Sequence, residues 1–312
     1  MKKPYRLISV EGCEILGEGA YGTVYRLDRE TVVKVYREGE KSLAVATKEQ
    51  QESREAFLLG VPTAIPFGIV KVGDQYGSVF ELIDAKNCND LIAQDPSLLD
   101  SLVSRYASLL CTLHGLEDTR GKLPSARRTY LAALESIGES LDAGTKDRTR
   151  QLLEEIPETH HLVHGDPQLK NVLLTDPEMI FIDLDHLCAG DPVFDLGALY
   201  ATYITFNEII PGDSLRFLKL PLEAATRIFH QTLLSYLEKR NGSSAFAGFL
   251  QGDESSPVIR RIQVIGYLRF LTILGIEQKD DHSDEKERQI GTAAEALSRL
   301  IPQVDHLSLL QP

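Results

Sequence analysis

The sequence lacks any long hydrophobic run. No apolar segment approaches the ~18–20 residues of a membrane-spanning helix, and the N-terminal lysines are not followed by an apolar stretch long enough for a signal peptide. Positive charge is also scarce, with 33 lysines and arginines against 46 aspartates and glutamates. The net charge of -13 argues against nucleic acid or an anionic membrane as the main partner, and is compatible with a cationic substrate.

Paired cysteines are missing as well. The four cysteines are scattered, without a C-x-x-C pair or metal-ligand spacing, and they are Cys13, Cys88, Cys111 and Cys188. This pattern is typical of free thiols in a reducing compartment, so we expect a cytoplasmic protein. The chain has no internal repeat or low-complexity segment, and its 312 residues are long enough for two lobes. The oligomeric state is not predicted.

Three polar residues in the middle of the chain have the spacing of a catalytic loop. Asp166 and Asn171 are separated by four residues, so one tight loop presents both. Two short apolar runs, 172–174 and 179–182, then predict a hairpin that returns Asp183 to the same loop. Each residue alone could cap a turn or end a strand. All three in this order suit Mg²⁺ holding a polyphosphate, and H-x-D-x-x-x-x-N followed by a strand-borne Asp is typical of kinases.

A glycine-rich turn near the N-terminus separates two predicted strands, and its glycines are Gly17, Gly19 and Gly22. Their backbone N–H groups could approach phosphate oxygens closely. A dinucleotide-binding turn has the same G-x-G-x-x-G spelling but opens a helix. Here Val24 follows in a strand and Lys34 lies inside the next one, 31–36. This order favours a kinase-type hairpin with Lys34 binding phosphate.

The segment 41–60 is predicted to be a helix, ending at Gly60 before a proline. It carries several glutamates, and the spacing alone cannot choose between Glu49 and Glu52 as the partner of Lys34. Two more strands follow. They complete five predicted strands with one helix, and they are 66–72 and 76–83. Backbone groups near Glu81 to Ile83 are expected to contact adenine.

The remainder is predicted to be mainly helical, from apolar residues at helical spacing. The predicted helices are 97–114, 127–141, 148–156, 196–209, 222–237, 258–274 and 290–301. The charged run 279–287 is expected to be a solvated loop or helix end. Three aromatics, Tyr200, Tyr203 and Phe206, could cage a quaternary ammonium group, although such stripes usually belong to a core.

Five segments resemble the kinase-like aminoglycoside and choline phosphotransferase superfamily, in particular a bacterial group of small-molecule kinases. They are GEGAYG, VVKVY, HGDPQLKN, FIDLD and GDPVFDLG, and the resemblance spans roughly residues 10 to 210. It implies an α+β, bilobal protein-kinase-like fold with ATP between the lobes. A small antiparallel β lobe with one helix, 1–84, would bind the nucleotide. A larger, mainly helical lobe, 85–312, would carry catalysis and the substrate.

The same resemblance implies roles for single residues. Asp166 would be the catalytic base, while Asn171 and Asp183 would hold Mg²⁺. Lys34 would bind phosphate with Glu49 as its partner, because Glu49 lies eleven residues before the glycine of GVPT. Asp195 would have a structural role and would connect the catalytic loop to the helix that follows it.

Two departures from the family pattern bear on the substrate class. Many relatives have His two residues after the catalytic Asp, where this chain has Gln168 after Pro167. The glycine loop also contains more of the G-x-G-x-x-G motif than most antibiotic kinases have, and in this it is closer to that of a protein kinase.

The sequence therefore predicts an ATP- and Mg²⁺-dependent phosphotransferase acting on a hydroxyl of a small molecule. The acceptor would be an aminoglycoside, an amino alcohol or a sugar-like molecule, possibly cationic. A protein kinase needs a peptide-docking segment ending in A-P-E, but only eleven residues separate Asp183 from Asp195 and A-P-E is missing. A nucleotide-binding pseudokinase scaffold is the remaining alternative.

Overall fold

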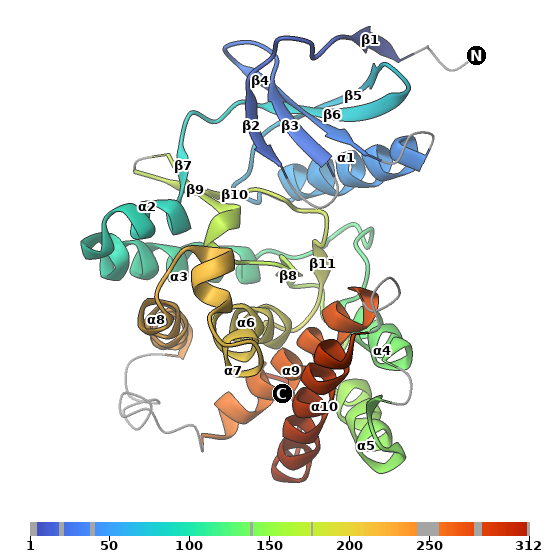
Figure 1. The fold of residues 1–312 in the computed structure, drawn as a ribbon, viewed down its shortest axis with the longest axis vertical. Coiled ribbons are helices and arrows are strands. Elements are labelled where there is room, and N and C mark those ends of the chain that lie inside the picture. Colours follow the sequence, from blue (N-terminus) through green and yellow to red (C-terminus); the bar gives the residue numbers. More distant parts are fainter. Residues whose placement is uncertain are drawn as a thin grey trace. The chain divides into compact units, whose positions relative to one another are not determined.

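The computed structural model describes residues 5–18, 22–37, 41–137, 140–175, 177–241, 256–277 and 283–310. The chain forms two compact units. The first comprises residues 1–86 and 173–187, and the second comprises residues 87–172 and 188–312. The predicted lobe boundary after residue 84 stays a prediction, and the first unit also takes in the later segment 173–187. The mixed α+β class is confirmed (Figure 1).

A six-stranded sheet forms the core of the first unit. Its strands are β1 (Arg6–Ile8), β2 (Ile15–Glu18), β3 (Gly22–Arg26), β4 (Thr31–Tyr36), β5 (Pro66–Val72) and β6 (Gln75–Glu81), in the order β1-β5-β6-β4-β3-β2. All neighbours pair antiparallel except β1, which is parallel to β5. The single helix α1 (Ser42–Leu58) packs against β5 and β6 (Figure 1). Alternating apolar residues bury one face of the sheet, with Val33 and Val35 of β4 and Val70 of β5 at its centre.

The first unit also contains the predicted hairpin. Its strands are β9 (Val172–Leu174) and β10 (Met179–Phe181). The turn is closed by the Thr175 N–H, which donates to the Glu178 carbonyl at 2.9 Å. The Phe181 N–H donates to the Pro62 carbonyl at 2.8 Å, and this bond fixes the end of the hairpin beside α1 of the same unit. The residues that follow β10, including Asp183, are therefore held against the first unit.

The second unit is mainly helical. Its helices are α2 (Cys88–Gln94), α3 (Leu99–Gly115), α4 (Ala126–Ser136), α5 (Ala143–Glu154), α6 (Val193–Tyr200), α7 (Phe206–Ile209), α8 (Leu222–Asn241), α9 (Pro257–Glu277) and α10 (Asp284–Leu300). The helix α6 packs on α9, and α3 packs on α8. A Cβ atom at Gly197 would overlap the Ile265 side chain, so glycine permits the close approach of α6 and α9. Among the described residues, no helix is both long and apolar enough to cross a membrane.

Two short strands of this unit come before and after the loop 164–171 in the sequence. β8 (Leu162–Val163) pairs antiparallel with β11 (Cys188–Ala189). The following loop contains Asp191, a fully buried carboxylate. It accepts hydrogen bonds from the Ser308 hydroxyl at 2.6 Å and from the Leu309 and Leu310 N–H groups at 3.1 and 3.3 Å. A contact between positions more than a hundred residues apart therefore fastens this loop.

Several elements differ from the sequence-based expectation. Strand β1 and helix α2 were not predicted. The predicted helix 196–209 is interrupted by a π-helical segment, Ala201–Thr205, before α7. Within the charged run, residues 279–282 lie outside the described residues, and Ser283 caps α10 by accepting from the Lys286 N–H at 3.4 Å.

The suggested aromatic cage is a core feature instead. Tyr200 and Tyr203 are almost fully buried. The Tyr203 hydroxyl accepts a hydrogen bond from the Leu169 N–H at 3.0 Å, and Phe206 stacks edge to face on Phe270. These rings pack inside the core of the second unit, so they do not form an open cage for a cation.

Candidate functional site

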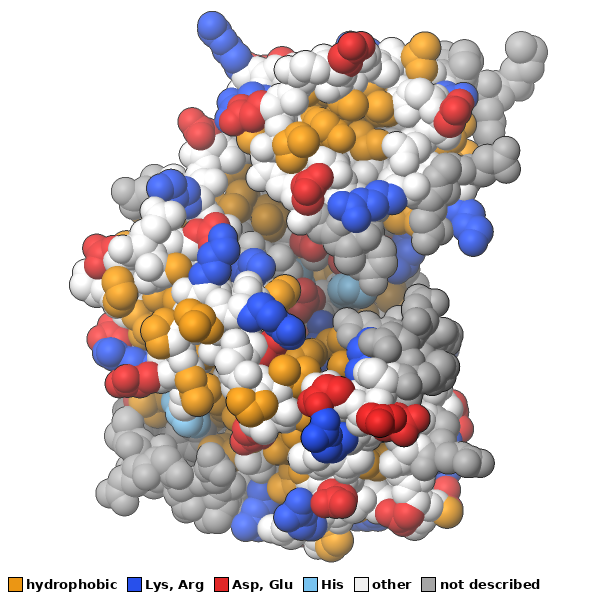
Figure 2. All heavy atoms as spheres, viewed as in Figure 1, with side chains coloured by type: hydrophobic (Ala, Val, Ile, Leu, Met, Phe, Trp, Pro, Cys, Tyr) orange, Lys and Arg blue, Asp and Glu red, His pale blue; other side chains and the backbone are white. Residues whose placement is uncertain are grey.

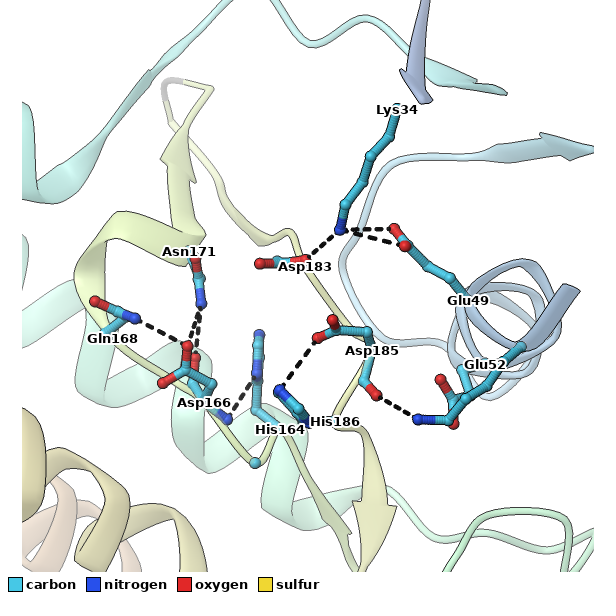
Figure 3. A network of polar contacts seen from close by, with 12 residues as sticks. Lys34, Glu49, Glu52, His164, Asp166, Gln168, Asn171, Asp183, Asp185 and His186 are labelled. Carbon is cyan, nitrogen blue, oxygen red and sulfur yellow. Dashed lines mark hydrogen bonds and ion pairs between the residues drawn. The ribbon is translucent and has the colours of Figure 1, made fainter. Parts of the chain in front are cut away.

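In the first unit, Lys34 is held by two carboxylates. Its ammonium nitrogen lies 3.2 Å from both oxygens of Glu49 and 2.9 Å from Oδ1 of Asp183 (Figure 3). Glu49 projects from α1 and is buried. Glu52, the alternative that spacing left open, faces Lys48 at 3.6 Å. The structure thus brings Lys34 together with Glu49.

These contacts set the charge state of the lysine. Burial by itself would favour a neutral amine, but the Glu49 and Asp183 carboxylates raise the pKa of Lys34 above its ordinary value. The site therefore holds a permanent positive charge on β4.

A second side chain of β4 reaches the same glutamate. The Tyr36 hydroxyl donates a hydrogen bond to Oε2 of Glu49 and lies 2.9 Å from the Ser78 hydroxyl on β6. Burial raises the pKa of Tyr36, and the neighbouring Glu49 carboxylate raises it further, so the phenol stays a donor. Sequence reasoning missed this residue, although its signal was available. Lys34 and Tyr36 are two positions apart on a strand and so share one face.

Asp183 has an unusual backbone conformation. Its φ of 60° lies in the left-handed region, which aspartate tolerates better than most residues. Two residues later, Asp185 is mostly buried, and its pKa is raised by that burial and by the Asp183 charge. The Asp185 carboxylate lies 3.7 Å from His186, and its carbonyl accepts from the Lys48 ammonium at 3.3 Å (Figure 3). The first unit thus carries two adjacent carboxylates beside a fixed lysine.

The predicted glycine turn is described only at its ends. Gly17 lies in β2, Gly22 begins β3, and Gly19 falls outside the described residues. A Cβ atom at Gly22 would overlap the Val35 carbonyl oxygen, so this position needs glycine for strand packing as well. Val24 is the register partner of Lys34 across β3 and β4.

Of the two residues expected near adenine, Glu81 ends β6 and Ile83 follows it. The Glu81 N–H donates to the Ile65 carbonyl at 2.9 Å, and its carboxylate accepts from the Ile65 N–H at 3.2 Å. The Ile83 carbonyl accepts from the Ala85 N–H at 2.9 Å. The first two bonds fix the end of β6, and the last closes a three-residue turn, 83–85.

In the second unit, Asp166 and Asn171 are in direct contact. The Asn171 side-chain amide donates to the Asp166 carbonyl at 2.9 Å and to its Oδ2 at 3.0 Å (Figure 3). Gln168 donates to the same Oδ2 at 2.8 Å. Since the Asn171 nitrogen is turned to Asp166, the amide oxygen is directed the other way. A carboxylate and an amide oxygen are therefore fixed in one loop.

This loop is fastened by Asp195 at the start of α6. The fully buried Asp195 carboxylate accepts from the His164 and Gly165 N–H groups, each at 2.8 Å, and lies 3.0 Å from Nε2 of His114. Burial alone would raise its pKa, but the hydrogen bond and charge of His114 keep the pKa of Asp195 below its ordinary value. The contacts match the structural role that the resemblance implied.

One residue of this unit was not anticipated. The guanidinium of Arg269, on α9, lies 3.2 Å from Oδ1 of Asp166, and both side chains are about four-fifths buried, at 20% and 21% exposure. The helix α9 also carries Arg260, Arg261, Gln263 and Glu277, so no local pattern singled out Arg269. Its distance from residue 166 in the sequence concealed the contact.

The comparisons with known proteins identify the family of the chain. The sequence profile of the phosphotransferase enzyme family matches residues 12–216. The chain belongs to this family. The match confirms the prediction of a kinase-type phosphotransferase and the resemblance to the aminoglycoside phosphotransferases. No curated protein matches the chain.

Solved structures of the family share the fold at low identity. The streptomycin-ATP-APH(2'')-IIa ternary complex matches with a TM-score of 0.56 and 14% identity, over 92% of this chain and 93% of that chain. A GDP complex of a mutant aminoglycoside 2'-phosphotransferase-IIIa matches with 0.56 and 16%, over 94% and 92%. The GDP and kanamycin complex of the same type matches with 0.54 and 15%, over 94% of each chain. These likenesses confirm the bilobal kinase-like fold.

Proposed function

We propose that this phosphotransferase moves the γ-phosphate of ATP to a hydroxyl group of a small molecule, with Asp166 as the base. The observation that carries the proposal is the contact of Lys34 with both Glu49 and Asp183. Kinase-type phosphoryl transfer needs a lysine placed by a helix-borne glutamate and an aspartate that holds the metal. The first unit supplies all three groups.

The side chains present fit Mg²⁺. Asn171 and Asp183 offer the amide and carboxylate oxygens that this ion prefers. Among the described residues no group of three or more His, Cys, Asp or Glu side chains forms a metal-binding cluster. Mg²⁺ typically takes only one or two protein ligands and completes its shell with waters and phosphate oxygens, so two ligands are enough. When bound, the ion would neutralise charge on the phosphates.

The remaining roles fall to the chain's own groups. The Lys34 ammonium and the backbone amides around Gly17 and Gly22 would hold the phosphates. Asp166 would orient the acceptor hydroxyl and take its proton as transfer proceeds. In this class of reaction positioning and charge neutralisation supply most of the rate acceleration.

A small acceptor is favoured over a protein. Only eleven residues separate Asp183 from Asp195, which leaves no room for a peptide-docking segment. The similar structures bear the names of aminoglycoside-modifying enzymes, two of them in complex with streptomycin or kanamycin. Their nucleotides are ATP in one and GDP in another, so GTP is a second candidate donor.

The test is a transfer assay with γ-labelled ATP and, in parallel, γ-labelled GTP. Labelled phosphate should appear in a pool of small alcohols, sugars and aminoglycosides, and not in casein or histone. Labelling of the proteins alone would make the chain a protein kinase. Tight ATP binding without transfer to any acceptor or to water would make it a pseudokinase.

A further inference from the structure

The carboxylate of Asp166, the base proposed above, forms an ion pair with Arg269. Arg269 lies 3.2 Å from Oδ1 of Asp166, while Oδ2 accepts from Gln168 and Asn171. Arg269 belongs to α9, beyond residue 216, where the family match ends. The arginine is therefore a feature of this chain outside the part shared with the family profile.

The position of Arg269 brings it within reach of the acceptor. A hydroxyl that gives its proton to Asp166 must lie about 2.6–3.2 Å from that carboxylate. Substituents next to this hydroxyl then come close to the guanidinium, because it touches the same carboxylate. A guanidinium is a planar fork of N–H donors that matches the oxygens of a carboxylate or phosphate.

Two lysines of the second unit lie near the same loop, with Asp90 as an opposing charge. Lys170 follows Asp166 by four residues, donates to the Phe217 carbonyl at 3.2 Å and lies 4.0 Å above the Phe217 ring. Its pKa is lowered, chiefly by burial and also by the nearby Lys219 charge. The loop and its flanking segments thus add two more cations.

Four carboxylates of the neighbouring elements have partners other than Arg269. Asp195 is buried against backbone N–H groups, as described above. The others bind groups of their own surroundings, namely Asp90 with Asn87 at 2.9 Å, Glu208 with the Tyr267 hydroxyl at 2.7 Å and Asp213 with Arg216 at 2.6 Å. On the face shown in Figure 2, acidic and basic side chains are interspersed, so the net charge of -13 is not gathered there into one acidic patch.

We infer that Arg269 is a specificity-determining residue that selects acceptor alcohols with a carboxylate or phosphate group near the reacting hydroxyl. The inference rests on the proposed function, because it takes Asp166 to be the base. An ammonium group in the same place would meet the Arg269 guanidinium, which already neutralises the Asp166 carboxylate and repels a second cation. The selected acceptor therefore differs from the cationic substrate that the overall charge suggested.

Three hexoses that differ in one charged group test this selection. They are glucuronate, glucose and glucosamine, assayed with ATP and Mg²⁺ against the wild type, Arg269→Met, Arg269→Lys and Arg260→Met. Wild type should prefer glucuronate over glucosamine by about tenfold or more in kcat/KM, a charge effect of the usual size. Arg269→Met should abolish that preference while the KM for ATP stays unchanged. Arg269→Lys should keep most of it, and Arg260→Met, on the same helix, should behave as wild type.

A merely structural role for Arg269 would lower transfer to all three sugars equally, and that result overturns the inference. Efficient transfer to glucosamine or to kanamycin by the wild type also overturns it, while leaving the proposed function intact. If the small-molecule pool yields a different acceptor, a cationic one overturns the inference, as does any acceptor whose kcat/KM is unaffected by Arg269→Met. Melting curves and ATP titrations of each variant separate misfolding from a loss of selection.

Discussion

Tyr36 donates its hydroxyl hydrogen to Glu49, the carboxylate that also holds the ammonium of Lys34. Because Lys34 and Tyr36 lie on the same face of β4, one short strand provides both the lysine proposed to bind phosphate and a hydrogen-bond donor that fixes its partner Glu49. The glutamate is thus held from two sides before any nucleotide arrives.

Removing the hydrogen bond from Tyr36 to Glu49 should lower both the stability of the fold and the affinity for nucleotide. In Tyr36→Phe the buried Glu49 oxygen loses its donor, which should lower the free energy of unfolding by about 1–3 kcal/mol. The KM for ATP should rise, because Lys34 loses a fixed partner. Urea unfolding and steady-state kinetics measure the two effects. Tyr25→Phe, on the neighbouring strand, is the control and should change neither; an equal effect there would contradict the role given to Tyr36.

Asp183 should be required for stabilisation by Mg²⁺ and ATP. Binding at one hundred times the dissociation constant stabilises a protein by about 2.7 kcal/mol, so wild type should show a clear rise in Tm with the two ligands together. Asp183→Asn should lose the rise that depends on Mg²⁺ while keeping the fold, since asparagine also tolerates a φ of 60°. If the rise persists in this variant, the metal is held elsewhere, and Asp185 is then the residue to test.

Asp166→Asn should separate chemistry from nucleotide binding. A general base contributes roughly 10²–10⁴-fold to a proton-transfer step, so kcat should fall by about that factor. The ATP affinity, measured by titration, should be nearly unchanged, because the base acts on the acceptor. Asp100→Asn, at an exposed site on α3, serves as the surface control. A matching loss of ATP affinity in Asp166→Asn would count against its assignment as the base.

Glu52 should make the protein less stable as the pH rises. Its pKa is raised from 4.5 to about 7, chiefly by burial, with Lys48 acting in the opposite direction. A carboxyl with a raised pKa binds its proton more tightly in the folded state, so between these two values the folded chain holds more protons than the unfolded chain. Stability must then fall with increasing pH through that window, by about 1–3 kcal/mol for this group.

The variant Glu52→Gln should not show this part of the loss. Thermal unfolding at pH 5 and pH 8 should give a smaller decrease for the variant than for wild type. Glu295→Gln, at an exposed position on α10, should show the same decrease as wild type. Parallel curves for Glu52→Gln and wild type would contradict the burial argument.

Local patterns in the sequence were sufficient for most elements of the fold. The strands β4 and β5 and the helix α1 lie where alternation and helix-forming residues predicted them. Strand β1 was missed because it has only three residues and its partner, β5, is about sixty residues away in the sequence. Such a parallel pairing leaves no local signal.

In the candidate site, too, contacts between residues close in sequence could be predicted and contacts between distant residues could not. The pairs close in sequence, such as Asp166 with Asn171, could be predicted from spacing. The choice of Glu49 over Glu52 could not, because both share faces of α1 and only the three-dimensional packing orients one of them to Lys34. Arg269 could not be placed at all, since the packing of α9 on α6 brings it to Asp166.

The hydrogen bonds between Asp191 and residues 308–310 also have a consequence for the nascent chain during synthesis. The ribosome must add 119 residues after Asp191 before Leu310 exists. At ~5–20 residues per second this takes roughly 6–24 s, during which the carboxylate lacks donors that it has in the finished fold. The loop beside β11 can therefore reach its final hydrogen bonding only after residue 310 has emerged, so the second unit matures late in synthesis.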